Sequence, residues 1–325
     1  MDDAVHRFCS ELKGSPVELY EPLRYILSLG GKRIRPLLTL LACDLFDAAV
    51  EKAVNPALGM ELFHNFSLIH DDIMDNAPLR RNQPTIHRKW NPGVAILSGD
   101  AMLVKAYQLI CTPESDLVMP DCILKILAIF NATALSVCEG QQLDMNYEKL
   151  DSVSVAQYIR MTELKTASLI AGSLKTGAII AGAKAEDADR MYEFGKNIGI
   201  AFQLQDDILD AYGSEAKFGK QKGGDIIANK KTFLLLKALE ISRHNAYKRE
   251  ELQQWIYSPV TDKDAKQKVE AVTAIYDFLN VRRLAEEEML NYYQKGLSFL
   301  EQIPANESKK ENLRKFIEGL MSREV

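Results

Sequence analysis

Apolar residues recur at intervals of three and four positions along almost the whole chain, which is the spacing of one face of an α-helix. No stretch of useful length alternates apolar and polar residues as a half-buried strand does. No linker divides the pattern, so it predicts an all-α protein with a single large helical bundle domain over residues 1–325. The expected helices cover residues 19–29, 37–46, 55–74, 93–109, 122–145, 155–164, 167–183 and 187–209, with further helices from 225 onward.

The expected helix 55–74 runs into the acidic sequence Asp71-Asp72-Ile73-Met74-Asp75. A helical period of 3.6 places Asp71 and Asp75 one above the other, with Asp72 about 100° to the side. Two carboxylates in one space repel each other, and burial adds a desolvation cost, so a cation is expected beside them. The alternative is a helix end whose acids face water, because one short motif of this kind also arises by chance.

The same spacing returns 135 positions later as Asp206-Asp207-Ile208-Leu209-Asp210, again at the end of an apolar helix. Two such motifs in matching contexts favour a metal site, because Mg²⁺ prefers oxygen ligands and is usually held by one or two carboxylates plus substrate phosphates. An EF-hand for calcium is disfavoured because neither segment has its alternating ligand loop. Zinc is disfavoured because no histidine and cysteine pattern lies nearby. The pair predicts two helix ends that clamp a diphosphate through bridging metal ions.

Basic residues gather in the segments between the expected helices. Lys32, Arg33 and Arg35 follow the helix stop at Gly30-Gly31, and the proline-rich loop 76–93 carries four more basic residues. The chain as a whole has a formal net charge of −5 and a pI near 5.7, which does not favour nucleic-acid binding. Any anion site must therefore be local.

Composition bounds the setting of the protein. The chain has 325 residues, is 47% apolar, and can bury a large core. Its five cysteines are odd in number and form no C-x-x-C pair, which favours reduced thiols and a cytoplasmic location. The acidic start Met1-Asp2-Asp3 argues against a signal peptide. The most apolar stretches, such as 168–183 with Lys175 inside it, fall short of a transmembrane span.

These motifs together resemble those of the trans-isoprenyl diphosphate synthases, the short-chain polyprenyl synthetases of the farnesyl and geranylgeranyl type. The resemblance runs from about Tyr20 to Leu236. It implies a homodimeric all-helical fold around a deep central cavity and three Mg²⁺ ions. It also implies the head-to-tail condensation of isopentenyl diphosphate with an allylic diphosphate. The matching segments, in order, are Gly30 to Pro36, Asp71 to Arg81, Lys165-Thr166, Gln203 to Asp210, and Phe218 to Asp225.

The resemblance assigns a role to each aspartate. Asp71, Asp75 and Asp206 are expected to bind the metal ions. Asp72, Asp207 and Asp210 are expected as further ligands or as supports for them. Metal ions and cationic side chains would neutralise the departing diphosphate, so that the allylic C1–O bond ionises to a carbocation.

Arginine and lysine side chains are expected to hold the two diphosphates. Those of the allylic substrate would be Arg80, Lys165, Lys220 and Lys230, although Lys230 could instead be a solvated charge whose place Lys231 takes. Isopentenyl diphosphate would lie against Lys32, Arg35, His64 and Arg81, where arginine forks suit phosphate oxygens. His64 precedes Asp71 by seven residues, about two turns along the same helix face.

Thr166 and Gln203 resemble the polar groups that line the carbocation. For Thr166, a hydrogen bond to the preceding helical turn is an adequate alternative. The family implies that the leaving pyrophosphate takes the proton that is lost in the last step. We therefore assign no side-chain general base.

Product length is expected to depend on the helix below Asp71. The family limits the product with bulky residues four and five positions before the first aspartate, here Ser67 and Phe66. On an ideal helix Phe63 lies closer to the Asp71 face than Phe66 does, so it could also contribute to the floor. The small residue at 67 predicts a C20 or C15 product. The C-terminus, Ser322 to Val325, lacks a basic tail, so closure of the site by the tail is not expected.

Three alternatives remain at this stage. One is a medium- or long-chain polyprenyl diphosphate synthase. A class I terpene cyclase would share the fold and the first aspartate motif, but Asp206 to Asp210 and the Lys32/Arg35 cluster argue against it. A non-catalytic partner subunit would usually have lost one aspartate motif, and both are intact here.

Overall fold

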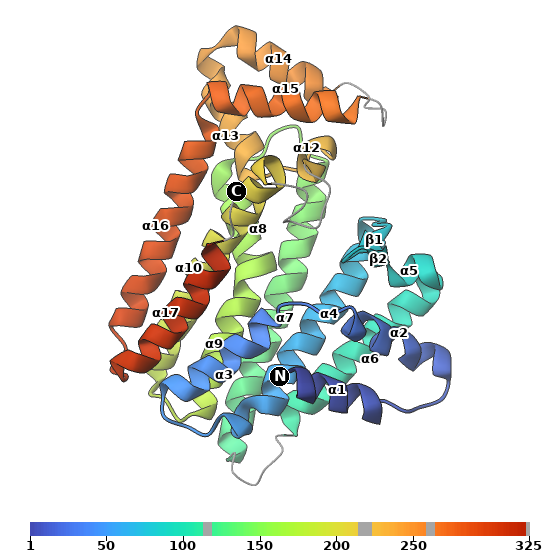
Figure 1. Ribbon diagram of the computed structural model, residues 1–325, viewed down its shortest axis with the longest axis vertical. Coiled ribbons are helices and arrows are strands. Elements are labelled where there is room, and N and C mark those ends of the chain that lie inside the picture. The colour runs from blue at the N-terminus through green and yellow to red at the C-terminus, as the bar shows by residue number, and fades with distance from the viewer. Residues whose placement is uncertain (113–118, 214–222, 258–263, 323–325) are drawn as a thin grey trace.

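The computed structural model describes residues 1–112, 119–213, 223–257 and 264–322. As expected, the fold is all-α (Figure 1). Its first half contains α1 (Asp2–Glu11), α2 (Val17–Ser28), α3 (Ile34–Leu45), the 3₁₀ turn Val50–Ala53, α4 (Val54–Met74), α5 (Ile86–Lys89), α6 (Pro92–Cys111) and α7 (Pro120–Glu148). Its second half contains α8 (Val155–Thr162), the π-helical turn Glu163–Ala167, α9 (Ser168–Ile180), α10 (Ala185–Tyr212), α12 (Gly224–Ile227), α13 (Phe233–Ile241), the 3₁₀ turn Ser242–His244, α14 (Ala246–Tyr257), α15 (Ala265–Phe278), α16 (Val281–Glu301) and α17 (Glu307–Met321).

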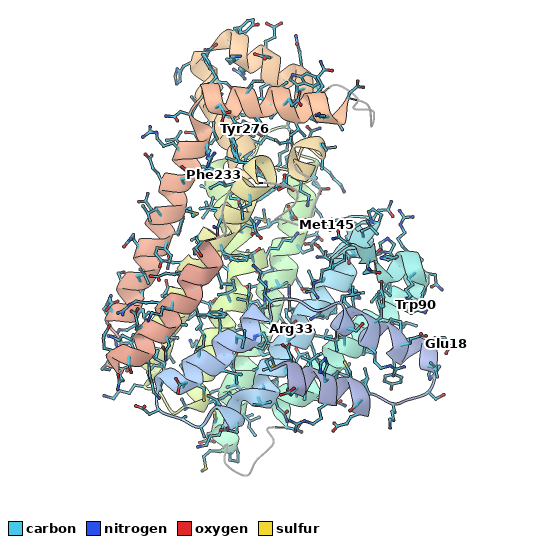
Figure 2. The ribbon with its side chains drawn as sticks, viewed as in Figure 1. Glu18, Arg33, Trp90, Met145, Phe233 and Tyr276 are labelled. Carbon is cyan, nitrogen blue, oxygen red and sulfur yellow. The ribbon has the colours of Figure 1, made fainter. Side chains whose placement is uncertain are left out.

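The long helices run side by side along the length of the molecule (Figure 1). α10 packs against α9 and α16, α4 packs against α6, and α7 packs against α9. Buried apolar side chains form the core between the helices, and Phe233 and Tyr276, labelled in Figure 2, are two of them. Phe63 of α4 and Phe130 of α7, for example, are fully buried with their ring centroids 5.4 Å apart. The bundle thus holds the ends of α4 and α10, which carry the two aspartate motifs.

The segment expected as a loop after α4 contains a small hairpin. Strands β1 (Leu79–Arg80) and β2 (Gln83–Pro84) pair antiparallel. Arg81 and Asn82 between them have φ angles of 52° and 61°, the two positive values that a type I′ turn requires. The pattern did not predict these strands, because two-residue strands are too short to show alternation. The hairpin sets the direction of the neighbouring Arg80 and Arg81.

The expected break at Lys165-Thr166 is not a loop. The chain continues as helix from Val155 to Ile180, and Glu163–Ala167 forms a π-helical turn within it. π-turns are uncommon and often lie at functional sites, since the extra residue redirects the side chains around it. The two helices predicted here are therefore one continuous helix with an irregular turn at Lys165.

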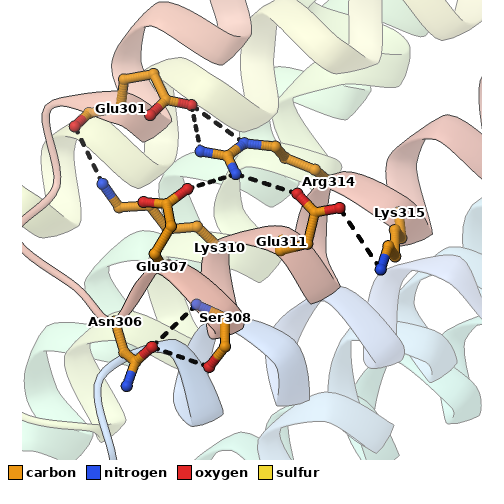
Figure 3. Close-up of polar contacts among 8 residues, drawn as sticks. All are labelled: Glu301, Asn306, Glu307, Ser308, Lys310, Glu311, Arg314 and Lys315. Atoms are coloured by element: carbon orange, nitrogen blue, oxygen red, sulfur yellow. Dashed lines mark hydrogen bonds and ion pairs between the residues drawn. The ribbon is translucent and has the colours of Figure 1, made fainter.

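The C-terminal helix α17 is fastened to the end of α16 (Figure 3). Asn306 caps its first turn, and Arg314 forms ion pairs with Glu301, Glu307 and Glu311. At the other end, the carbonyl of Met321 accepts a hydrogen bond from the side chain of Gln205 on α10. α17 therefore ends beside the second aspartate motif, and closure of the site by the tail stays untested.

Within the described residues, two helices are long and apolar enough to cross a membrane by length and composition alone, α6 and α7. Core helices of globular proteins pass the same test, so this observation by itself is weak evidence for a membrane span. Both helices pack against others in the bundle.

Candidate active site

Two adjoining cavities lie where α4, α7 and α10 come together, and Met74 lines both. The first has a volume of about 540 Å³ and reaches from the ends of α4 and α10 down along α7. The second has a volume of about 920 Å³ and lies between the end of α4 and the segment that follows α12. The residues that line them include most of the polar side chains that the sequence singled out.

Asp71 and Asp75 of α4 face the two adjoining cavities, one each. Asp71 Oδ1 lies 3.2 Å from the Nζ of Lys165, and Asp71 Oδ2 lies 3.7 Å from Arg80 Nη2. Burial raises the pKa of Asp75, and the neighbouring charge of Asp71 raises it further. The structure thus shows the repulsion that was expected for two carboxylates at this spacing, together with cations beside them.

Asp72 does not face the cavities. It is 3% exposed and accepts hydrogen bonds from Arg80 Nε, at 3.0 Å and 2.9 Å to its two oxygens, and from Arg80 Nη2 at 2.7 Å. Burial raises the pKa of Asp72 although Arg80 acts in the opposite direction. The guanidinium fork engages both oxygens, so of the two roles expected for Asp72 the structure favours the support over the metal ligand. Its role here is to fix Arg80, which lines the first cavity.

The second motif on α10 is divided in the same way. Asp206 lines the first cavity and Asp210 lines the second. Asp210 Oδ2 also accepts a hydrogen bond of 3.0 Å from the backbone N–H of Asp225 at the start of α12. The first and third aspartates of both motifs therefore lie at the two cavities, as the resemblance implied.

For Asp207, too, the structure favours the supporting role. It is 4% exposed and accepts hydrogen bonds from the hydroxyl of Tyr158 at 2.7 Å, the amide of Gln203 at 3.1 Å and the N–H of Phe233 at 3.2 Å. Burial in this neutral surrounding, and the charge of Asp225, raise the pKa of Asp207 to about 7. Both oxygens face the core, so Asp207 joins α8, α10 and α13 and does not reach the cavities.

Lys165 projects into the first cavity from the π-helical turn. Gly140 of α7 allows this turn to approach closely, because a Cβ atom at position 140 would collide with the backbone nitrogen of Lys165. The Nζ of Lys165 lies 2.6 Å from Asp144 Oδ2 and bridges it to Asp71. The pKa of Lys165 is raised: burial lowers it, but Asp71 and Asp144 more than offset burial. Asp144 was not predicted as a site residue, since nothing in the α7 pattern distinguishes it from a solvated acid.

Thr166 and Gln203 also line the first cavity and contact each other. The hydroxyl of Thr166 donates a hydrogen bond of 3.1 Å to the side-chain oxygen of Gln203, whose amide in turn donates to Asp207. The alternative for Thr166, a bond to the preceding helical turn, is not the arrangement found. The two side chains place neutral oxygen atoms beside Asp206.

Arg35, His64 and Arg81 line another part of the first cavity. Burial lowers the pKa of Arg35 to about 10, so its side chain stays charged at neutral pH. Burial, together with Arg35 and Arg81, lowers the pKa of His64 well below its usual value, so the imidazole is neutral. Arg81 donates a hydrogen bond to the carbonyl of Gly30 and packs on Gly31, where a Cβ atom would lie 2.8 Å from its Nη2.

Lys32 and Arg33, the two basic residues just before α3, do not line the cavities as Arg35 and Arg81 do. Lys32 is exposed and lines neither cavity, so its place beside isopentenyl diphosphate stays a prediction. Arg33 is buried and lies 2.6 Å from Glu61, and it also donates to the carbonyl of Leu27. Arg33 is a structural ion pair that the sequence did not separate from Arg35. Arg33 has a φ angle of 48° and directly precedes α3, whereas Arg35 lies within the first turn of that helix.

Lys230 lines the second cavity, as does Lys231. Burial lowers the pKa of Lys230, but the carboxylates of Asp225 and Asp75 more than offset it, so the pKa is raised overall. Both lysines are thus available at this cavity, and the alternative between them stays open. Lys220 lies outside the described residues.

Of the three residues expected to limit product length, two line the first cavity and the third packs behind them. Phe66 and Ser67 line the first cavity, and the hydroxyl of Ser67 donates to the carbonyl of His64. Phe63 is 1% exposed and packs against Phe130 and against the outer side of Phe66, with a distance of 5.5 Å between the rings of Phe63 and Phe66. Phe63 lines neither cavity, so any contribution of Phe63 to product length would act through its contact with Phe66.

The carboxylates suit a divalent metal that is shared with a phosphate ligand. Among the described residues, no three Asp, Glu, His or Cys side chains lie close enough together to hold a metal ion by themselves. Asp71 Oδ1 is buried, and its contact with Lys165 at 3.2 Å is an ion pair without hydrogen-bond geometry, which leaves its lone pairs for a metal ion. Mg²⁺ commonly takes one or two carboxylates plus phosphate oxygens and waters, so the donors fit this mode of binding.

Comparison with known proteins agrees with this arrangement. The chain is 40% identical over 225 residues to the geranylgeranyl diphosphate synthase of Methanosarcina mazei, covering 69% of the chain and 68% of that protein. A crystal structure of a geranylgeranyl pyrophosphate synthase superposes with a TM-score of 0.91 at 39% identity, over 100% of the chain and 99% of that protein. The Corynebacterium glutamicum enzyme, solved with isoprenyl diphosphate and magnesium, superposes with a TM-score of 0.88 at 25% identity, over 99% and 97% of the two chains.

The family model for the polyprenyl synthetases matches residues 16–275, a range that contains both aspartate motifs, the π-helical turn and the basic segment before α3. Enzymes of this family are prenyltransferases that act on isoprenyl diphosphates and use a divalent metal. The chain belongs to the polyprenyl synthetase family.

Proposed function

We propose that the protein is a short-chain trans-prenyltransferase that adds isopentenyl diphosphate head-to-tail to an allylic diphosphate and forms geranylgeranyl diphosphate, with farnesyl diphosphate as the shorter alternative. The allylic substrate would be dimethylallyl, geranyl or farnesyl diphosphate. The observation that carries the proposal is the first cavity. It joins Asp71, Asp206 and Lys165 to a separate cationic group, Arg35 and Arg81, and an aromatic wall at Phe66.

The residues of the two motifs that reach the cavities would hold the metal, which we propose is Mg²⁺, with three ions as in the resemblance. These residues are Asp71, Asp75, Asp206 and Asp210. When bound, the metal would neutralise negative charge on the leaving diphosphate. Lys165, Arg80 and Lys230 add positive charge at the same end, and charge placed in advance around a leaving group lowers the barrier to its departure.

The allylic C1–O bond breaks with its electron pair on the departing diphosphate, and the double bond of isopentenyl diphosphate attacks C1. Arg35 and Arg81 hold the second diphosphate apart from the first, and Thr166 and Gln203 face the cation with neutral oxygens. The new cation then loses a proton to the departed diphosphate. His64 is a weak base because its pKa is so low, which agrees with the assignment of no side-chain base.

The length of the product would be limited by Phe66. Phe63 packs against its ring from the core, and the ring of His70, which also lines the cavity, lies 4.8 Å from it. The change Phe66→Ala should open the wall and shift the products of elongation toward longer chains. Phe63→Ala should reduce stability by about 3–5 kcal/mol and change the product less. An unchanged product spectrum for Phe66→Ala, in a folded enzyme, would show that this residue is not the limit.

One assay tests the proposal against its alternatives. The protein is incubated with Mg²⁺, labelled isopentenyl diphosphate and each allylic primer in turn, and the products are dephosphorylated and identified. A C20 alcohol is the expected product. Chains of 30 carbons or more would indicate a long-chain synthase, a cyclic hydrocarbon would indicate a terpene cyclase, and no elongation with any primer would support a non-catalytic subunit.

A homodimer is also proposed, supported by the outer face of α6 and α7. Single exposed apolar residues are normal, but a row of them on adjacent helices is typical of an interface. An interface at these residues would explain why α6 and α7 are apolar although few of their residues are buried. It is an alternative to a location of these helices in a membrane. A single domain over residues 1–325 and the cytoplasm remain predictions. The exposed residues are Ile96, Leu97, Val104, Leu124 and Leu135.

A further inference from the structure

Lys268 of α15 is a buried lysine that lines neither cavity. It is 1% exposed, and its Nζ donates hydrogen bonds to the side-chain oxygen of Asn229 at 2.6 Å and to the carbonyl of Ile227 at 3.3 Å. Both acceptors are neutral, and burial lowers the pKa of Lys268. Burying an ammonium group costs free energy unless hydrogen bonds offset that cost. The two hydrogen bonds of Lys268 therefore hold its side chain at Asn229 and Ile227.

Asn229 joins three segments of the chain. Its φ angle is 54°, a left-handed conformation that ends α12, and its amide donates a hydrogen bond of 3.0 Å to the carbonyl of Ile256 in α14. Its side-chain oxygen accepts the hydrogen bond from Lys268. The turn after α12 is therefore held from outside by α14 and α15, which lie across the end of the bundle (Figure 1).

The residue next to Lys268 holds the other end of α12. A Cβ atom at Gly223 would lie 2.5 Å from Val269, so α15 packs closely against the residue that precedes α12. Gly223 has a φ angle of 74° and needs glycine for this reason as well. Lys268 and Val269 thus contact both ends of α12 from one side, while Asp210 of α10 accepts hydrogen bonds from the N–H groups of Gly223 and Asp225 on the other.

α12 and its following turn carry charged groups into the second cavity. Asp225 and Lys230 line that cavity together with Asp75, and the backbone N–H of Lys230 donates 2.9 Å to the carbonyl of Asp225. Arg35, His64 and Arg81 lie in the first cavity instead. A displacement of the turn at Asn229 would therefore affect one diphosphate site and leave the other in place.

We propose that Lys268 is a positioning residue for the allylic diphosphate, which acts through Asn229 to hold Asp225 and Lys230 at the second cavity. This inference rests on the proposed function, in which Lys230 binds the allylic substrate. It assigns a role in substrate binding to α15, a helix whose own side chains lie outside both cavities.

The test is the change Lys268→Met, which removes the amine and keeps the apolar stem. The KM for the allylic diphosphate should rise about tenfold, while the KM for isopentenyl diphosphate changes by less than about twofold. The affinity for farnesyl S-thiolodiphosphate, which resists ionisation, should fall by a similar factor in calorimetric titration with Mg²⁺. Asn229→Gly, which tolerates the left-handed turn but lacks the amide, should reproduce both shifts. The double variant should add little to either.

Lys310→Met is the matched control. Lys310 is 6% exposed and donates 3.1 Å to the carbonyl of Glu301 between α16 and α17, away from both cavities (Figure 3). It should lose stability and keep both KM values. If Lys268→Met and Asn229→Gly change both KM values equally, or neither, Lys268 is a structural residue and the inference is wrong. Failure of the wild-type protein to elongate any primer would instead overturn the proposed function.

Discussion

The two aspartate motifs have the same spacing, but the protein holds their middle residues in different ways. On α4, Asp72 is clamped by the charged fork of Arg80. On α10, Asp207 is held by three neutral donors, and its pKa is raised to about 7. The outer residues of both motifs face the cavities.

In each motif, therefore, the first and third aspartates form a pair that faces the cavities, and the middle aspartate supports the surrounding structure. In the first motif the support is an ion pair that also sets the direction of a cationic side chain lining the cavity. In the second it is a buried hydrogen-bond network that connects α10 to α8 and α13. Asp72 and Asp207 are almost equally buried, at 3% and 4% exposed, so both carboxyl groups need partners, and one finds a cation while the other finds neutral donors.

The largest expected effect distinguishes the outer residues from the middle ones. Asp71→Asn and Asp206→Asn should each lower kcat by about 10²–10³-fold, because each removes a charge at the leaving diphosphate. Steady-state kinetics at saturating Mg²⁺ is the measurement, with folding checked by circular dichroism. Asp72→Asn and Asp207→Asn are the matched variants. If either of them loses as much turnover while still folded, the division into pair and support fails.

The second effect tests the ion pair at Asp72. Arg80→Lys should lower the free energy of unfolding by about 1–3 kcal/mol, because an ammonium cannot reproduce the two parallel hydrogen bonds of the fork. Urea denaturation measures it. Arg88→Lys in the nearby helix α5 is the control, since Arg88 donates a hydrogen bond to the side chain of Asn76 at an exposed position. Equal losses in the free energy of unfolding for the two variants would show that the paired hydrogen bonds of Arg80 add no stability of their own.

The third effect tests the raised pKa of Asp207. A carboxyl whose pKa is higher in the folded state than in the unfolded state binds an extra proton on folding between the two values. Its contribution to stability is complete below about pH 4 and is lost as the pH rises through about 7, by up to about 1.4 kcal/mol per pH unit. The measurement is the free energy of unfolding as a function of pH. The difference between the wild type and Asp207→Asn should fall with rising pH in this range. Parallel profiles would contradict the assignment.

The smallest effect concerns the donor to Asp207. Tyr158→Phe should cost about 1 kcal/mol of stability, since one hydrogen bond is lost from a network that keeps two others. The hydroxyl of Tyr158 lowers the pKa of Asp207, so the loss of stability with rising pH should move to higher pH in this variant. Tyr212→Phe removes a bond to Asp277 at an exposed position and should leave that pH unchanged.

Much of this protein follows from its sequence because the relevant patterns are local. The apolar period predicted α4 as 55–74, and the helix runs from Val54 to Met74. The spacing of Asp71 and Asp75 placed them on one side of that helix, and both face cavities. Side-chain direction within one helix depends only on residues within a few turns, so a single sequence is enough to predict it.

The tertiary structure decided the features that depend on residues far apart in the chain. The sequence could not show that Arg80 forms an ion pair with Asp72 or that Lys268 donates a hydrogen bond to Asn229. Nor could it show that the π-helical turn at Lys165 packs closely against Gly140. It also could not decide between Phe63 and Phe66, since the face of α4 that becomes a wall depends on where α7 packs. Such choices depend on contacts between separate helices, and these contacts exist only after the chain has folded.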